Sequence, residues 1–416
     1  MEVTVHPSQI AGSVTAPSSK SLTQRAIAAG LLASGTTIIH NPSFCNDSLA
    51  AIGMARALGA SVSWDKNSIT IRGGSGVLSP VTLNCGESGL ALRMFAPVAA
   101  LLADRVTLTG EGSLVKRPVT MISEALPRFG VKIQSTDGLL PVTMTGNLSA
   151  GKALLDGSGG SQLLTGLLMS LPLLESGSEI TVENLKSRPY IAMTLKLLED
   201  FGVSVVNDSF RHFGIPGGQL YRSRDYTVEG DWSGSAFLLV AGAVAGALKV
   251  NNLDVSSLQA DSAIIKALQD AGCMPLAEAA GVKAERCDLK AFVFDATDSP
   301  DLFPPLAALA SYCRGTSRII GVSRLKHKES DRAGAIADLL GAMNIRVLIT
   351  GDEMLVTGSR PGGATVSSHN DHRIAMMAAV MALAADDAVT ITGAGAVDKS
   401  YPGFFDDLAR AGAKIS

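Results

Sequence analysis

The chain has 416 residues, of which 46% are apolar and 18% charged, with a net charge of −3, so it is long and apolar enough for two or three folded domains. The nearly balanced charge argues against nucleic-acid binding, and no apolar run is long enough to span a bilayer. Its five cysteines lack the spacing of a disulfide framework or a metal site, and we expect a cytoplasmic protein.

A unit of about seventy residues recurs along the chain. Its clearest mark is a glycine between a predicted helix and the next strand, found at Gly59, Gly130, Gly202, Gly272, Gly341 and Gly412. Neighbouring glycines are 69 to 72 residues apart, which indicates six copies of one structural unit. Because glycine readily adopts the left-handed conformation that ends many helices, we predict that each one caps a helix.

Each unit opens with a β-branched strand. These predicted strands cover residues 35–39, 105–109, 179–182, 248–250, 316–320 and 389–392. An amphipathic helix follows, as over residues 189–201.

One helix on one small sheet leaves an apolar face in water, so these units must pack against one another. We predict two α/β domains of three units each. One covers residues 16–227, and the other is discontinuous, with residues 1–15 joined to 228–416. The same periodicity would fit a non-catalytic repeat scaffold. However, the unusual residues are not repeated from unit to unit and lie in loops, where binding and catalytic residues usually occur, which argues against a scaffold.

The first of these loops lead into helices in the first half of the chain. Lys20, Ser21 and Arg25 lie at the start of a helix that continues to residue 32. Free N–H groups and cations there can bind phosphate or carboxylate. Gly89 lies in a second small-residue turn, where glycine lets a ligand approach the backbone. Each stretch alone would also fit an ordinary helix cap.

Three more loops of the first half have the same character. Arg117, in a Lys-Arg-Pro run, can grip a carboxylate or phosphate with two N–H groups, and Pro118 suits a first helical position. Ser161 with Gln162, and Ser187, begin two further helices with hydroxyl and N–H donors. Together these helix starts predict a site for a polyanion.

The second half adds carboxylates to cations. Its candidates are Asp301, Lys328, Glu329, Arg332, Arg373 and Lys399. Alone, Asp301 would fit a helix cap, and the charged run 326–332 would fit a solvated helix start. Acids among cations distinguish catalysis from simple anion storage, because proton transfer needs a base and an acid.

These stretches, in order along nearly the whole chain, resemble the motifs of the 5-enolpyruvylshikimate-3-phosphate synthase family. The Lys-Ser-x-x-x-Arg run at 20–25 and the Lys-Glu-Ser-Asp-Arg run at 328–332 are the most specific. The resemblance implies a two-domain inverse α/β barrel, or prism, of six β-α-β-α-β-β units, whose domains close on the substrates. It implies a monomer that transfers the enolpyruvyl group of phosphoenolpyruvate to the 5-hydroxyl of shikimate 3-phosphate, with no metal or cofactor.

The resemblance also implies which residues bind each substrate. For shikimate 3-phosphate they are Lys20, Ser21, Arg25, Ser161, Gln162, Ser187, Asp301 and Lys328. For phosphoenolpyruvate they are Lys20, Gly89, Arg117, Gln162, Arg332, Arg373 and Lys399. We expect Asp301 to take the proton of the 5-hydroxyl and Glu329, which must then hold a proton near neutral pH, to protonate C3. Lys20 and Lys399 would stabilise the departing phosphate.

Some positions depart from the family pattern. Glu87 stands where asparagine is usual, Leu90 where threonine is usual, and Met94 where proline often follows the arginine. Glu87 and Leu90 flank Gly89 and so bear on the affinity for phosphoenolpyruvate.

Two alternatives remain open. UDP-N-acetylglucosamine enolpyruvyl transferases usually carry a cysteine in the loop before their catalytic arginine, and residues 110–117 contain none. Ser21, where that family usually has asparagine, also favours the shikimate interpretation. The other alternative is a relative that binds anions without turnover.

Overall fold

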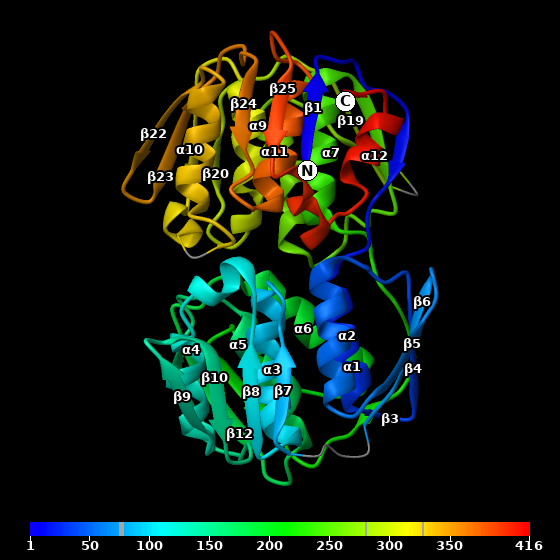
Figure 1. The fold of residues 1–416 in the computed structure, drawn as a ribbon, viewed down its shortest axis with the longest axis vertical. Coiled ribbons are helices and arrows are strands. Elements are labelled where there is room, and N and C mark those ends of the chain that lie inside the picture. The colour runs from blue at the N-terminus through cyan, green and yellow to red at the C-terminus, as the bar shows by residue number, and fades with distance from the viewer. Residues whose placement is uncertain (75–78, 279–280, 327) are drawn as a thin grey trace. The chain divides into compact units, whose positions relative to one another are not determined.

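The computed structural model describes residues 1–74, 79–278, 281–326 and 328–416. The chain forms two compact units, drawn in Figure 1. One, here called the terminal unit, combines Met1–Pro17 with Glu229–Ser416. The other, the central unit, is Ser18–Val228.

Six four-stranded sheets occur in the described part of the chain, three in each unit, and all share one pairing pattern. The first two strands of each sheet are parallel and the next two pairs are antiparallel. In the central unit the sheets are β16 (Asp225–Thr227), β4 (Thr36–His40), β6 (Ser68–Arg72), β5 (Ser61–Trp64); β7 (Val81–Asn84), β8 (Arg105–Thr109), β10 (Leu139–Thr145), β9 (Lys132–Thr136); and β11 (Lys152–Asp156), β12 (Ser178–Glu183), β14 (His212–Ile215), β13 (Val206–Asp208). A short pair, β15 (Tyr221–Arg222) with β3 (Ala33–Ser34), accompanies them.

The terminal unit repeats this arrangement. Its sheets are β2 (Ser13–Thr15), β17 (Ala247–Asn251), β19 (Gly281–Glu285), β18 (Leu276–Glu278); β20 (Val293–Asp295), β21 (Thr316–Ile320), β23 (Glu353–Thr357), β22 (Arg346–Thr350); and β24 (Ala364–Ser367), β25 (Val389–Thr392), β1 (Glu2–His6), β26 (Lys414–Ile415). Strands β8, β21 and β25 have the bounds that their β-branched sequences predicted. The other three predicted strands differ by one or two residues at their ends.

The first helix of every repeat is buried on nearly all sides. These helices are α1 (Lys20–Leu32), α3 (Gly89–Leu102) and α5 (Gln162–Ser170) in the central unit, and α7 (Trp232–Ala245), α9 (Phe303–Ser311) and α11 (His372–Ala382) in the terminal unit. Because nearly all of their residues are buried, these helices form the centre of each core. Figure 1 shows the sheets of each unit outside these helices.

The second helices are half-exposed and amphipathic. They are α2 (Asn46–Ala57), α4 (Thr120–Ala125), α6 (Arg188–Asp200), α8 (Ile264–Asp270), α10 (Arg332–Ala342) and α12 (Phe404–Arg410). Short 3₁₀ helices precede or follow several of the first and second helices: η1 (Gly112–Lys116), η2 (Leu126–Phe129), η3 (Leu171–Leu173), η4 (Ala260–Ala263), η5 (Pro300–Leu302), η6 (Val322–Leu325) and η7 (Ala394–Lys399). Within the described ranges, no helix combines the length and hydropathy needed to cross a membrane.

Where the chain passes from one unit to the other, the strand just before the crossing pairs within the unit that the chain is leaving. β2 precedes α1 in the sequence but pairs with β17 of the terminal unit. β16 likewise precedes α7 but pairs with β4 of the central unit. The N-terminal strand β1 lies between β25 and β26 and completes the last sheet. The first residues of the chain therefore belong to the terminal unit.

Five of the six repeat glycines end a helix in the predicted left-handed conformation. Their φ angles lie between 80° and 110°. The prediction for Gly341 is wrong, because α10 continues through it to Ala342. Asn344, with φ 62°, takes the left-handed position in that repeat, which asparagine tolerates better than most residues. Pro118 is also not a first helical position, since α4 begins at Thr120.

Candidate active site

Lys20 begins α1 in the central unit. Ser19 caps that helix, and its hydroxyl accepts a hydrogen bond from the Leu22 N–H at 3.4 Å. The Lys20 ammonium forms an ion pair with Asp47 of α2 at 2.9 Å, and both side chains are largely buried. Asp47 lies 27 residues from Lys20 and in no recognisable motif, so the sequence alone did not indicate it. Asp47 therefore balances the charge of Lys20.

Arg25 lies one turn further along α1 and is almost fully buried. Its guanidinium donates to the Thr194 hydroxyl of α6 at 3.0 Å and to the Ser21 carbonyl at 2.9 Å. Burial lowers the pKa of Arg25 to about 10, so the side chain stays charged at neutral pH. These bonds connect Lys20, Ser21 and Arg25 with α6, the helix that Ser187 precedes.

Ser187 has an unusual backbone for a serine, with φ 59° in the left-handed region. Such conformations are strained for residues other than glycine, and they occur frequently at functional sites. Ser187 is also buried, as is Ser161, which precedes α5. Both serines therefore lie at helix starts, as predicted.

The start of α3, at Gly89, lies close to Arg117 and, through Arg93, to Gln162. A Cβ atom at Gly89 would lie 2.9 Å from Nη1 of both Arg117 and Arg93. Arg93 in turn donates to the Gln162 side-chain oxygen at 3.0 Å. Glycine at position 89 thus leaves room for two guanidinium groups. Arg93, the arginine that precedes Met94, thus connects α3 with α5.

Glu87, which departs from the family pattern, is hydrogen-bonded to the loop before Arg117. Its carboxylate accepts the Ser113 N–H at 2.8 Å and lies where a Cβ of Gly112 would be. Leu90 and Met94 are buried core residues on α3. The departures are therefore accommodated by local packing and hydrogen bonding.

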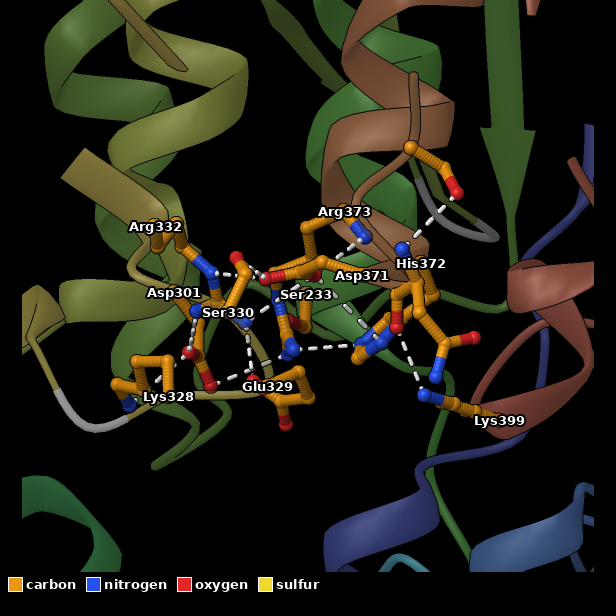
Figure 2. A network of polar contacts seen from close by, with 12 residues as sticks. Ser233, Asp301, Lys328, Glu329, Ser330, Arg332, Asp371, His372, Arg373 and Lys399 are labelled. Carbon is orange, nitrogen blue, oxygen red and sulfur yellow. Dashed lines mark hydrogen bonds and ion pairs between the residues drawn. The ribbon is translucent and has the colours of Figure 1, made fainter. Parts of the chain in front are cut away.

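In the terminal unit, Arg332 is surrounded by three carboxylates, as Figure 2 shows. Its side chain is 0% exposed. It donates to Asp371 at 2.9 Å and to Asp301 at 2.9 Å, and it also contacts Glu329. We call Asp301, Lys328, Glu329, Arg332, Asp371 and Arg373 the Arg332 network.

Arg373 is the second guanidinium of the network. Its Nη2 lies 3.1 Å from Asp301 and donates to the Ser233 hydroxyl at 2.7 Å. Its Nη1 lies 2.6 Å from Nε2 of His372. A guanidinium can only donate, so we assign this His372 nitrogen as the acceptor, with the imidazole neutral.

Asp301 is ionised in this network. Burial by itself would raise its pKa, but Arg373, Lys328 and Arg332 outweigh burial and hold the pKa of Asp301 well below its usual range. Asp301 lies within η5 and makes ion pairs, so it is not merely a helix cap. Lys328, 3.3 Å from Asp301, has its pKa lowered by burial more than its acidic neighbours raise it.

Lys399 ends η7 and is buried. It donates to the Asn370 carbonyl at 2.7 Å, just before Asp371. Figure 2 shows it beside the Arg332 network. All six candidates of the second half therefore come together, whereas His327 of the same charged run lies outside the described residues.

Sequence reasoning missed several members of this network. Asp371 was not among the candidates that the sequence indicated. It caps α11 through the Arg373 N–H and binds Arg332 with the same carboxylate. Ser233 and His372 were not singled out either. Only the packing of α7, α10 and α11 brings these residues together.

Comparisons with known proteins identify the relatives of this chain. A family model described as EPSP synthase (3-phosphoshikimate 1-carboxyvinyltransferase) matches residues 5–408. A protein of Methanocorpusculum labreanum named 3-phosphoshikimate 1-carboxyvinyltransferase is 38% identical over 423 residues, covering 100% of this chain and 99% of its own. A protein of the same name from Clostridium kluyveri is 37% identical, covering 99% of this chain and 98% of its own.

Solved structures agree with these sequence matches. An EPSP synthase of Acinetobacter baumannii superimposes with a TM-score of 0.84 at 26% identity, covering 100% of this chain and 99% of that one. The enolpyruvyl transferase NikO of Streptomyces tendae reaches a TM-score of 0.81 at 20% identity, which supports the fold alone. The predicted two-domain inverse α/β barrel is confirmed.

Proposed function

This chain belongs to the EPSP synthase (3-phosphoshikimate 1-carboxyvinyltransferase) family, and on that premise we propose which residues perform its reaction. The chain transfers the enolpyruvyl group of phosphoenolpyruvate to the 5-hydroxyl of shikimate 3-phosphate and releases phosphate. The observation that carries the assignment of roles is that two carboxylates, Asp301 and Glu329, contact one buried guanidinium, Arg332.

In the first step the 5-hydroxyl oxygen attacks C2 of phosphoenolpyruvate. Asp301 accepts the hydroxyl proton, and Glu329 donates a proton to C3, which gives a tetrahedral intermediate. In the second step C3 loses a proton to Glu329 and the C2–O bond to phosphate breaks. The transferred group again carries a double bond, and the phosphate leaves.

Asp301 is in the correct form for a base, because its pKa lies well below its usual range and it is ionised. The same cations that keep it ionised also make it weakly basic. Arg332 and Arg373 are proposed to bind phosphoenolpyruvate, and its negative charge would offset theirs. Binding of that substrate therefore raises the basicity of Asp301 at the moment it is needed, and it favours a protonated Glu329 in the same way.

Cations from both units are proposed to bind the substrates. Lys20, Ser21, Arg25, Ser161, Gln162, Ser187, Asp301 and Lys328 contact shikimate 3-phosphate, and Lys20, Gly89, Arg117, Gln162, Arg332, Arg373 and Lys399 contact phosphoenolpyruvate. Lys20 and Lys399 stabilise the phosphate as it departs. Asp47 holds the Lys20 ammonium in place, and the Asn370 carbonyl holds the Lys399 ammonium.

One chain supplies every group in this scheme, so we propose that the protein acts as a monomer. We also propose that it acts in the cytoplasm. The scheme uses no metal and no organic cofactor.

Phosphate release tests the proposed reaction and its alternatives. Purified protein with phosphoenolpyruvate and shikimate 3-phosphate should release inorganic phosphate in equal amount to the enolpyruvyl product. UDP-N-acetylglucosamine as the acceptor should give no release. Phosphate release with UDP-N-acetylglucosamine but not with shikimate 3-phosphate would indicate a UDP-N-acetylglucosamine enolpyruvyl transferase instead. Calorimetric binding of shikimate 3-phosphate without phosphate release would show a relative that binds anions without turnover.

A further inference from the structure

Behind Arg373 lies a buried acid that the proposed reaction does not use. Asp261, in η4, is only 2% exposed. Its carboxyl group forms a hydrogen bond with the Ser233 side chain, and Arg373 and Asp301 are close enough to influence its charge. Ser233 therefore lies between Arg373, which donates to its hydroxyl at 2.7 Å, and Asp261.

The geometry of this chain of contacts has one natural direction. A guanidinium can only donate, so the Ser233 oxygen accepts from Arg373. The Ser233 hydroxyl proton is then directed to Asp261, whose carboxyl oxygen accepts it. Arg373, Ser233 and Asp261 thus form a continuous hydrogen-bonded series that ends in a buried carboxyl group.

The segments that carry Ser233 and Asp261 are fastened to each other. The Asp231 carboxylate accepts the Ser233 N–H at 2.9 Å and caps α7. Gln259 accepts the Trp232 N–H at 3.2 Å and donates to the Gly230 carbonyl at 2.7 Å. These hydrogen bonds connect the start of α7, which carries Ser233, to the residue that precedes η4, which carries Asp261.

We propose that Ser233 and Asp261 are positioning residues for Arg373, which together fix its guanidinium in the orientation that receives the anionic substrate. The inference rests on the proposed function, in which Arg373 binds phosphoenolpyruvate. His372 and Asp301 hold the guanidinium from other sides. Ser233 is uncharged, so it can orient the Arg373 guanidinium without neutralising the positive charge that binds the substrate.

The protonation state of Asp261 matters for the same reason. Burial is the largest of the causes that raise the pKa of Asp261, followed by the neighbouring carboxylates of Asp301 and, more weakly, Asp231. Arg373 and the Ser233 hydrogen bond lower this pKa. The net result is a pKa of about 7. When Asp261 is protonated and neutral, it does not offset the positive charge of Arg373, which can then attract the anionic substrate. Ionised Asp261 competes for that charge, so substrate binding should weaken as the pH rises through 7.

Steady-state kinetics of Ser233→Ala and Asp261→Ala test the positioning role. At pH 6, where Asp261 is mostly protonated, each should raise the KM for phosphoenolpyruvate by about tenfold, the loss expected for one misplaced charged contact, and change the KM for shikimate 3-phosphate less than twofold. Ser235→Ala is the matched control, because Ser235 is a buried serine of the same helix whose hydroxyl has no partner among the described residues. An unchanged KM for phosphoenolpyruvate in Ser233→Ala would overturn the proposal.

Asp261→Asn tests the effect of charge and guards against a folding defect. Asparagine can still accept from Ser233 but cannot ionise. With a pKa near 7, the ratio of wild-type to Asp261→Asn kcat/KM for phosphoenolpyruvate should fall about tenfold between pH 6 and pH 8. Taking this ratio cancels the ionisation of the substrate itself. A ratio that does not change with pH would contradict the charge argument.

These outcomes are distinct from failure of the proposed function. If wild-type protein releases no phosphate, the function is wrong. If wild-type protein is active while Ser233→Ala and Asp261→Asn behave like Ser235→Ala, only the positioning role is wrong. Equal losses for both substrates together with a lower melting temperature would show a structural role and would also overturn it.

Discussion

Arg332 and Arg373 are each held by acidic or polar side chains of the same unit. Without such partners, a buried guanidinium would leave its charge uncompensated, which costs several kcal/mol. With them, the site is arranged before the substrate arrives, so little reorganisation is needed during the reaction. Lys20 and Asp47 show the same arrangement on a smaller scale.

At the residue scale, Lys20 and Glu329 are the sharpest tests of the proposed roles. We expect Lys20→Ala and Glu329→Gln each to lower kcat at least about a hundredfold, because one removes charge from the departing phosphate and the other removes the proton donor. Stopped or continuous phosphate assays at saturating substrates measure this. Rates close to wild type in both purified variants would refute the assignment.

A surface ion pair supplies the controls for both substitutions. Lys152 and Glu179 pair at 2.9 Å but are 78% and 64% exposed. Lys152→Ala and Glu179→Gln make the same chemical changes at the surface, where ion pairs contribute little. Both control proteins should keep wild-type kcat.

At the scale of the element, the repeat glycines show how one sequence signal can have two structural meanings. Gly272 has φ 91° and ends α8 in the left-handed region, whereas Gly341 lies within α10. The spacing along the chain is the same in both cases. The difference arises because Asn344, three residues beyond Gly341, takes the left-handed position in that repeat.

The two glycines should therefore respond in opposite ways to alanine. Gly272→Ala should destabilise the protein by about 1 kcal/mol or more, because a Cβ is strained at positive φ. Gly341→Ala should stabilise it by about 0.5–1 kcal/mol, because alanine favours a helix and a Cβ there meets no atom within 4 Å. Urea denaturation of both variants measures the shifts, and shifts of the same sign would contradict this interpretation.

At the scale of the whole molecule, two compact units carry separate parts of the proposed site. Lys20, Ser161 and Ser187 belong to the central unit, whereas Asp301 and Lys328 belong to the terminal unit. All five are predicted to contact shikimate 3-phosphate. A ligand that contacts both units stabilises both against unfolding.

Calorimetric melting tests this expectation. Shikimate 3-phosphate at a hundred times its Kd should stabilise the protein by about 2.7 kcal/mol. If the two units melt separately, both transitions should move upward. Shikimate without the phosphate is the control ligand and should give a much smaller shift at the same concentration. A shift confined to one transition would show that the predicted contacts of the other unit are wrong.

The sequence by itself determined the repeat, the bounds of several strands, the helix starts with anion-binding character and most of the cations of the site. These features depend on local patterns such as β-branched runs, helical periodicity and capping residues, which are readable within a few residues. It also placed Asp301 and Glu329 among the cations, through their position in charged helix starts.

Only the tertiary structure decided which acids balance which cations. Asp47 with Lys20, Asp371 with Arg332, and Ser233 with Arg373 are 27, 39 and 140 residues apart. No local pattern distinguishes these partners from other polar residues at helix starts. Their pairing depends on how the buried helices pack, because only packing brings side chains from separate repeats within hydrogen-bonding distance and removes the water that would otherwise solvate them.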